Sequence, residues 1–151
     1  MGLLLDAFGE GAILIKSSVD NRSAAIELAG ELLVASGKAN KAYIASMLEV
    51  VEKFGPYIVI APGIALAHGK PGDGVIEAGL SLLMLESPIE FQHSQNDPVQ
   101  LVFGLAATDH ESHIELMAGL AQFLSDQENV NTLLTCSDSA QIRALIGTIA
   151  K

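Results

Sequence analysis

Four histidines, His68, His93, His110 and His113, are the residues of this sequence best suited to chemistry. The sequence shows no serine–histidine–acid spacing, no Walker loop and no CxxC pair, so it lacks familiar signatures of hydrolases, nucleotide-binding proteins and redox proteins. Histidine has a free pKa of about 6.5, so the neutral imidazole that predominates near pH 7 offers a nucleophilic lone pair without a separate base. We therefore expect any reaction to involve these rings.

His68 lies where an apolar segment gives way to a loop rich in Gly and Pro, residues 69–74. A strand before His68 would hold its backbone while the ring reaches solvent, which suits a nucleophile. Lys70 follows two positions later and is the single Lys or Arg among residues 54–142. We interpret the pair as a nucleophile beside a lone positive charge; a surface histidine next to a solvated lysine is the alternative.

The segment Thr108-Asp-His-Glu111 fits the S/T-x-x-E capping box, which predicts a helix with Thr108 as its N-cap. At about 100° per residue, His110 and His113 fall inside the apolar arc of this helix, so we expect both rings to point inward. The helix would begin near the carboxyl edge of the sheet, where its amides and dipole favour an anion such as phosphate. Two hydrogen-bonded histidines near the core, or a zinc site shared with His68, are the alternatives.

Two further reactive side chains receive no role. His93 lies in a polar connection between predicted strands and is interpreted as a solvated turn residue. Cys136 is the sole cysteine and cannot form an internal disulfide. It follows an apolar pair and has no basic neighbour, which predicts a half-buried, unreactive thiol.

The elements that must position these residues follow from hydrophobic periodicity. Helical spacing predicts two helices, one from Asp20 or Asn21 to Gly37 and one from Asn40 to Gly55, after an apolar segment at residues 12–16. Apolar or β-branched runs predict strands at residues 57–60, 64–67, 78–85 and 99–107. Helices are predicted again at 108–125, 127–134 and 138–149. This order indicates an α/β layered domain with a mixed, about five-stranded central sheet flanked by helices on both faces.

Length and composition bound the function. With 151 residues and 15.8 kDa the chain suits one domain over residues 1–151, and half of its residues are hydrophobic, which predicts a substantial core. The richest apolar stretch, residues 57–67, is far shorter than the roughly 20 residues of a membrane-spanning helix. A net charge of −10 leaves no basic surface for nucleic acid. The N-terminal residues lack a secretory signal pattern, so we expect a cytoplasmic protein.

The stretch GPYIVIAPGIALAHGKP, from Gly55 to Pro71, resembles the active-site stretch of enzyme IIA components of the bacterial sugar phosphotransferase system (PTS). The resemblance is to the type-2, fructose/mannitol superfamily and is closest to its ascorbate-type branch. It continues through residues 79–83, 96–99 and His113, and the order of elements agrees across nearly the whole chain. The position before the histidine is often proline in that family and is Ala67 here.

The resemblance implies a phosphotransferase that needs no cofactor. In that family the carrier HPr passes a phosphoryl group to the histidine matching His68, which passes it to a cysteine of the IIB component and so serves the membrane component IIC. His113 then supports the phosphoryl group, and Gly69, Lys70 and Thr108 are the further candidates for phosphate contact. His110 has no counterpart that would assign it a role.

The same resemblance implies a sugar class and leaves a second function open. Ascorbate, or a related acid or pentitol, is the expected substrate class. A regulatory IIA-like module, which signals by its phosphorylation state without feeding a transporter, is the alternative function. The acidic charge suits a partner with a basic face, as HPr has in the family, and the apolar fraction would allow a homodimer.

Overall fold

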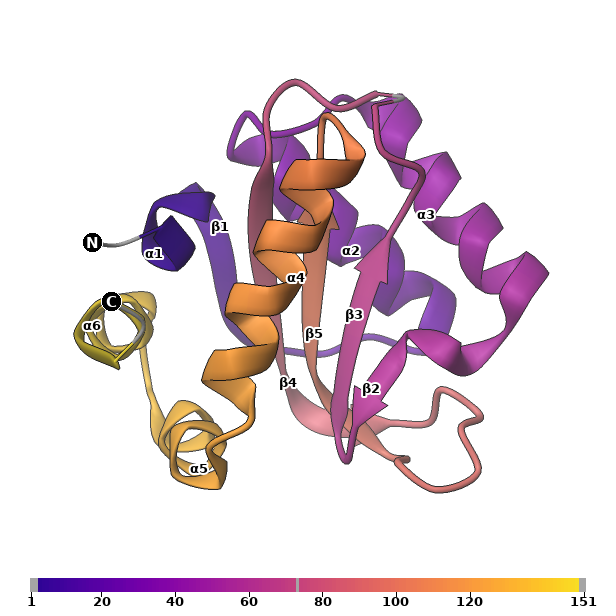
Figure 1. Cartoon of the computed structure of the whole chain (residues 1–151). Helices are drawn as coiled ribbons and strands as arrows, with labels where there is room; N and C mark the ends of the chain where they lie inside the picture. Colours follow the sequence, from indigo (N-terminus) through magenta and orange to yellow (C-terminus); the bar gives the residue numbers. More distant parts are fainter. Residues whose placement is uncertain (1–2, 73, 150–151) are drawn as a thin grey trace.

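Five strands form one mixed sheet in the computed structural model, which describes residues 3–72 and 74–149. The strands lie in the order β1-β4-β5-β3-β2 (Figure 1). Their bounds are β1 Phe8–Ser17, β2 Val59–Ala61, β3 Ile64–His68, β4 Gly79–Ile89 and β5 Val99–Ala106. The pairs β1–β4 and β3–β5 are parallel, and the pairs β4–β5 and β2–β3 are antiparallel. The predicted mixed sheet of about five strands is confirmed.

Helices cover both faces of the sheet, as the sequence predicts (Figure 1). On one face lie α2 (Arg22–Ala35) and α3 (Lys41–Phe54). On the other lie α1 (Leu3–Ala7), α4 (His110–Leu124), α5 (Gln127–Thr135) and α6 (Ser139–Ile149). Within the described residues, no helix has the length and apolarity needed to cross a bilayer.

Two hydrophobic cores result, because alternate residues of a strand point to opposite faces of the sheet. In β4, Leu82 belongs to the core beneath α4, and the next residue, Leu83, belongs to the core beneath α2 and α3. In β5, Phe103 and Val102 divide between the two cores in the same way. Burial on both faces explains why these two strands read as nearly continuous apolar runs rather than alternating ones.

Several elements differ from the predicted ones, and β1 is longer than the expected apolar segment at residues 12–16. The start of the expected strand 57–60 forms a 3-10 turn, η1 (Pro56–Ile58), because α3 ends at Gly55 with φ 77° and a proline follows. β4 runs on to Ile89, which pairs with Val99 after an irregularity in the ladder. Helix α1 has no counterpart among the predicted elements, because its 5 residues are too few for a helical period.

The N-cap of α4 is Asp109, so the prediction of Thr108 as the cap is wrong by one residue. The Asp109 carboxylate accepts a hydrogen bond of 2.8 Å from the amide of Ser112, and the Asp109 amide donates to the Ser112 hydroxyl at 3.4 Å. Both threonine and aspartate suit an N-cap, but the positive end of the helix favours the carboxylate. The hydrogen bond from the Ser112 amide, followed by the interaction of the carboxyl with the Ser112 side chain, holds the pKa of Asp109 below its usual value. Thr108 is left exposed just before the cap.

Candidate functional site

His68 is the last residue of β3, and its ring is held by contacts at both nitrogens. Its Nδ1 lies 3.1 Å from the carbonyl oxygen of Leu66, and its Nε2 lies 3.0 Å from the hydroxyl of Tyr57. A carbonyl oxygen can only accept, so Nδ1 carries the proton of the neutral ring. The lone pair is therefore at Nε2, and the Tyr57 hydroxyl donates to it.

Burial keeps this imidazole neutral. Desolvation lowers the pKa of His68 below 6.5, and the Leu66 carbonyl partly opposes the shift by favouring the protonated ring. At neutral pH the unprotonated form predominates, and its lone pair is fixed at one defined atom. This is the state in which an imidazole can act as a nucleophile.

His113 lies beside His68, and their ring centroids are 5.5 Å apart at an interplanar angle of 68°. His113 is half-buried in the first turns of α4, and desolvation lowers its pKa, with smaller contributions from the charges of His68 and His110. The structure thus brings together two histidines, His68 and His113, that lie 45 positions apart in the sequence.

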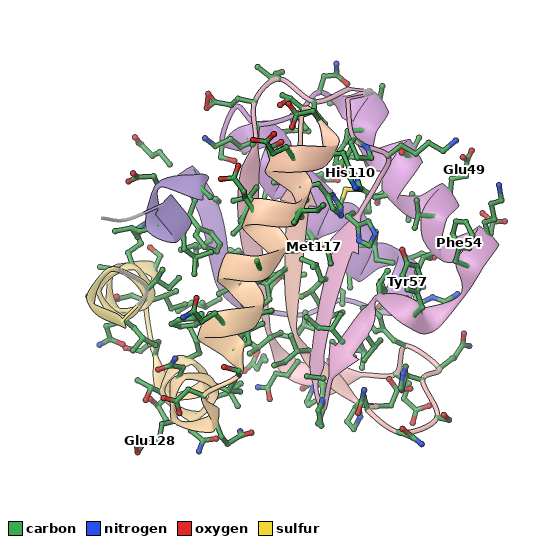
Figure 2. The ribbon with its side chains drawn as sticks, viewed as in Figure 1. Glu49, Phe54, Tyr57, His110, Met117 and Glu128 are labelled. Carbon is green, nitrogen blue, oxygen red and sulfur yellow. The ribbon has the colours of Figure 1, made fainter. Side chains whose placement is uncertain are left out.

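The expectation that the His110 ring points inward is wrong, although its charge acts on His113. His110 is exposed on the first turn of α4, where Figure 2 labels it. The buried residues of this helix begin only at Leu116, so its first turn projects past the core. The apolar face predicted for a whole helix does not show at which turn the helix extends beyond the core.

The loop after His68 is fixed by hydrogen bonds to α3. The amide of Gly69 donates to the hydroxyl of Tyr43 at 2.9 Å, and that hydroxyl donates to the carbonyl of Leu105 on β5 at 2.7 Å. The amide of Lys70 donates to the hydroxyl of Ser46 at 3.0 Å. Both amides therefore point into the protein, and the Lys70 side chain lies on the exposed surface.

Close packing favours glycine at position 69. A Cβ atom there would lie 2.6 Å from the hydroxyl oxygen of Ser46 and 3.0 Å from the ring of Tyr43. The Tyr43 side chain is 1% exposed, and its burial raises its pKa to about 12 although the Gly69 amide acts in the opposite direction. Helix α3 thus defines the position of the chain immediately after His68.

Residues 7–148 match the protein family described as phosphoenolpyruvate-dependent sugar phosphotransferase system, EIIA 2. The chain belongs to this family. The ascorbate-specific PTS system EIIA component of Escherichia coli (strain K12) is 36% identical over 145 residues, which cover 95% of this chain and 94% of that protein.

Two solved structures agree with this assignment. The mannitol-specific cryptic phosphotransferase enzyme IIA CmtB from Escherichia coli has 31% identity and a TM-score of 0.85, over 96% of this chain and 98% of that one. Enzyme IIAMTL, solved in complex with phosphorylated enzyme IIBMTL from Escherichia coli, has 26% identity and a TM-score of 0.82, over 93% and 96%. The chain is thus an EIIA component of a sugar phosphotransferase system, a phosphotransfer relay protein.

The other candidate side chains of this EIIA chain have structural contacts. The Nδ1 atom of His93 accepts hydrogen bonds from the amides of Gln95 and Asn96, so this ring organises its own turn. Cys136 is buried, its thiol donates to the carbonyl of Thr132 at 3.4 Å, and desolvation raises its pKa. Within residues 3–72 and 74–149, no three His, Cys, Asp or Glu side chains gather as metal ligands, so the zinc alternative has no ligand set there.

Three residues at this site escape prediction from the sequence: Tyr57, Tyr43 and Ser46. Tyr57 reads as the start of a strand, and the other two read as members of the buried stripe of a helix and its flank. Their contacts with residues 68–70 span 11 to 26 positions of sequence. The only local signal is Tyr43, a tyrosine at an inward-facing helix position. A buried tyrosine hydroxyl needs a hydrogen-bond partner, but the sequence does not indicate which one.

Proposed function

We propose that this EIIA chain accepts a phosphoryl group from phospho-HPr on Nε2 of His68 and passes it to a IIB component, with residues 1–151 acting as a single domain. The observation that carries the proposal is the hydrogen bond of Nδ1 to the Leu66 carbonyl, which leaves the lone pair at Nε2. A neutral, oriented imidazole at the end of a strand is what in-line phosphoryl transfer requires, because that chemistry depends on positioning and electrostatics.

The transfer balances without a cofactor. The Nε2 lone pair of His68 forms the new N–P bond as the N–P bond of the donor phosphohistidine breaks, and the donor ring takes back its electron pair. Nδ1 of His68 keeps its proton throughout the transfer, and this N–H stays hydrogen-bonded to the Leu66 carbonyl. Because the phosphorylated ring stays protonated at Nδ1, it leaves as a neutral imidazole when a thiolate of the IIB component attacks phosphorus.

We assign supporting roles to the neighbours of His68. His113, with its ring centroid 5.5 Å away, can donate a hydrogen bond to a phosphoryl oxygen. Lys70 and Thr108 are exposed and contribute a mobile cation and a hydroxyl from the surrounding surface. Gly69 contributes by close packing, because its amide is bonded to Tyr43.

The partners follow from the relay. The complex of the related IIA and IIB proteins supports a IIB component as acceptor. The net charge of −10 supports a donor with a basic face, such as HPr. Ascorbate is the proposed transported substrate, supported by the ascorbate-specific relative, and the membrane component IIC is reached only through IIB.

Labelling tests this function. The chain is incubated with phosphoenolpyruvate, enzyme I and HPr, and we expect acid-labile, base-stable phosphate on the wild type and none on His68→Ala. His110→Gln is the matched control, because that exposed histidine on α4 should leave the label unchanged. His113→Ala should slow labelling without abolishing it. Label that survives His68→Ala contradicts the proposal.

A further inference from the structure

We propose that the hydroxyl of Tyr57 blocks the nucleophilic nitrogen of His68 in the unphosphorylated protein and must turn away before an N–P bond can form. The distance from this hydroxyl to Nε2 is 3.0 Å. The inference rests on the proposed function, because it concerns access to the same atom.

The direction of the hydrogen bond carries the argument. Nδ1 of His68 already donates to the Leu66 carbonyl at 3.1 Å, so Nε2 has no proton and the Tyr57 O–H is the donor. A lone pair that accepts a hydrogen bond is not free to attack phosphorus. Phosphorylation therefore breaks this contact; Tyr57 keeps its own proton, and no proton passes between the two residues.

The surroundings of Tyr57 allow this movement. Its side chain is 54% exposed, whereas the next residue, Ile58, is 2% exposed and anchors the backbone of η1. The Tyr57 ring has edge contacts with Phe54 and His68, with ring centroids 6.0 Å and 5.9 Å apart. Phe54 is itself 60% exposed. Figure 2 labels Phe54 and Tyr57 next to each other where α3 gives way to η1 and β2. The hydroxyl can therefore leave Nε2 by rotation of an exposed side chain over a fixed backbone.

His68, by contrast, cannot relieve the block by moving. Its ring is held by the Leu66 carbonyl through Nδ1, and the ring of His113 packs against it. The next residue, Gly69, is tied to Tyr43. The mobile partner of the hydrogen bond is therefore Tyr57, and a donor that docks on this surface meets an exposed tyrosine before it meets the nucleophile.

Tyr57→Phe tests the block, because it removes the hydroxyl and keeps the ring. Phosphoramidate is the probe: Nε2 attacks its phosphorus, the P–N bond breaks, and the amino group leaves with that electron pair and becomes ammonia by taking a proton from water. At about pH 9, where the ring is neutral in both proteins, we expect phosphorylation of Tyr57→Phe to be roughly two- to tenfold faster, as for loss of one hydrogen bond. Ile60→Val, which trims an exposed apolar side chain on β2, is the control and should leave the rate unchanged.

An NMR titration of the His68 ring gives a second readout that needs no phosphoryl transfer. Because the hydroxyl stabilises the unprotonated Nε2, its removal should raise the pKa of His68 by up to about one unit. An unchanged or lower pKa together with an unchanged rate overturns the proposal. A slower rate also overturns it, because the hydroxyl would then assist transfer. Failure of the wild type to be phosphorylated at His68 contradicts the proposed function instead, and the titration still tests the contact.

Discussion

The substitution Tyr43→Phe removes one hydroxyl from the interior and leaves two backbone groups without their partner. The amide of Gly69 loses its acceptor at 2.9 Å, and the carbonyl of Leu105 loses a donor at 2.7 Å. A buried polar group left unpaired costs about 1–3 kcal/mol. With partial relaxation of the loop, we expect the free energy of unfolding to fall by about 2–4 kcal/mol near pH 8.

The decrease in free energy of unfolding caused by Tyr43→Phe should become smaller as the pH rises. Burial raises the pKa of Tyr43 from 10.0 to about 12, so the folded state favours the neutral phenol. The resulting stabilisation is complete below the unfolded pKa of 10.0 and is lost as the pH rises toward about 12. At about pH 11 the free energy of unfolding of the wild type should have fallen by about 1.4 kcal/mol through this titration, which Tyr43→Phe lacks. The difference in free energy of unfolding between the two proteins should therefore be smaller by that amount.

Urea unfolding of both proteins between about pH 8 and pH 11 measures the difference in free energy, and an unchanged m-value shows that the same surface is exposed. Tyr57→Phe is the matched control, because Tyr57 is the other tyrosine of the sequence and is exposed. Because Tyr57→Phe loses only the hydrogen bond to His68 at the surface, the difference between its free energy of unfolding and that of the wild type should stay constant across this pH range. A difference between wild type and Tyr43→Phe that stays constant with pH, or that is below about 1 kcal/mol, would refute the reasoning.

Three further predictions concern the same end of the molecule. Gly69→Ala should lower the free energy of unfolding by about 1–3 kcal/mol in urea, because the new Cβ meets the Ser46 side chain and the Tyr43 ring; an unchanged free energy would contradict this close packing. Asp109→Ala should lower the unfolding midpoint more than Thr108→Ala, because Asp109 caps α4; equal effects would contradict the cap. The rate of phosphorylation of His68 by phosphoramidate should fall at acid pH with a midpoint below 6.5, because protonation removes the lone pair and burial lowers the pKa; a midpoint above 6.5 would contradict this.

The sequence is sufficient to predict the layers because the two-sided burial of β4 and β5 leaves a continuous apolar run that few other structures produce. Helix ends were predictable where the residue types leave one choice, as at Asn40, whose side chain caps α3. They were not predictable where two capping residues adjoin, as at Thr108 and Asp109. In that case the helix dipole and the carboxylate, rather than the motif, decide the outcome.

The site was predictable only in part for a different reason. His68 and His113 stand out because each is a titratable residue at the end of a predicted element. Tyr57 and Tyr43 do not, because each lies in an apolar run and its hydroxyl finds its partner only after the chain folds. Long-range contacts of this kind leave no periodic signal in the sequence.

The hydrogen bonds of the resting site also bear on the relay itself. Two amides that a phosphate could use, those of Gly69 and Lys70, are bonded to α3, and the amide of Ser112 is bonded to Asp109. In the proposed function, a phosphoryl group on His68 therefore cannot use these three amides unless their present hydrogen bonds break. Fixed backbone donors would stabilise the phosphorylated protein, which is the ground state for onward transfer. Donors that bind this ground state more tightly than the transition state raise the activation free energy and slow the transfer. A carrier that has to release its phosphoryl group to a second protein is better served by the arrangement found here.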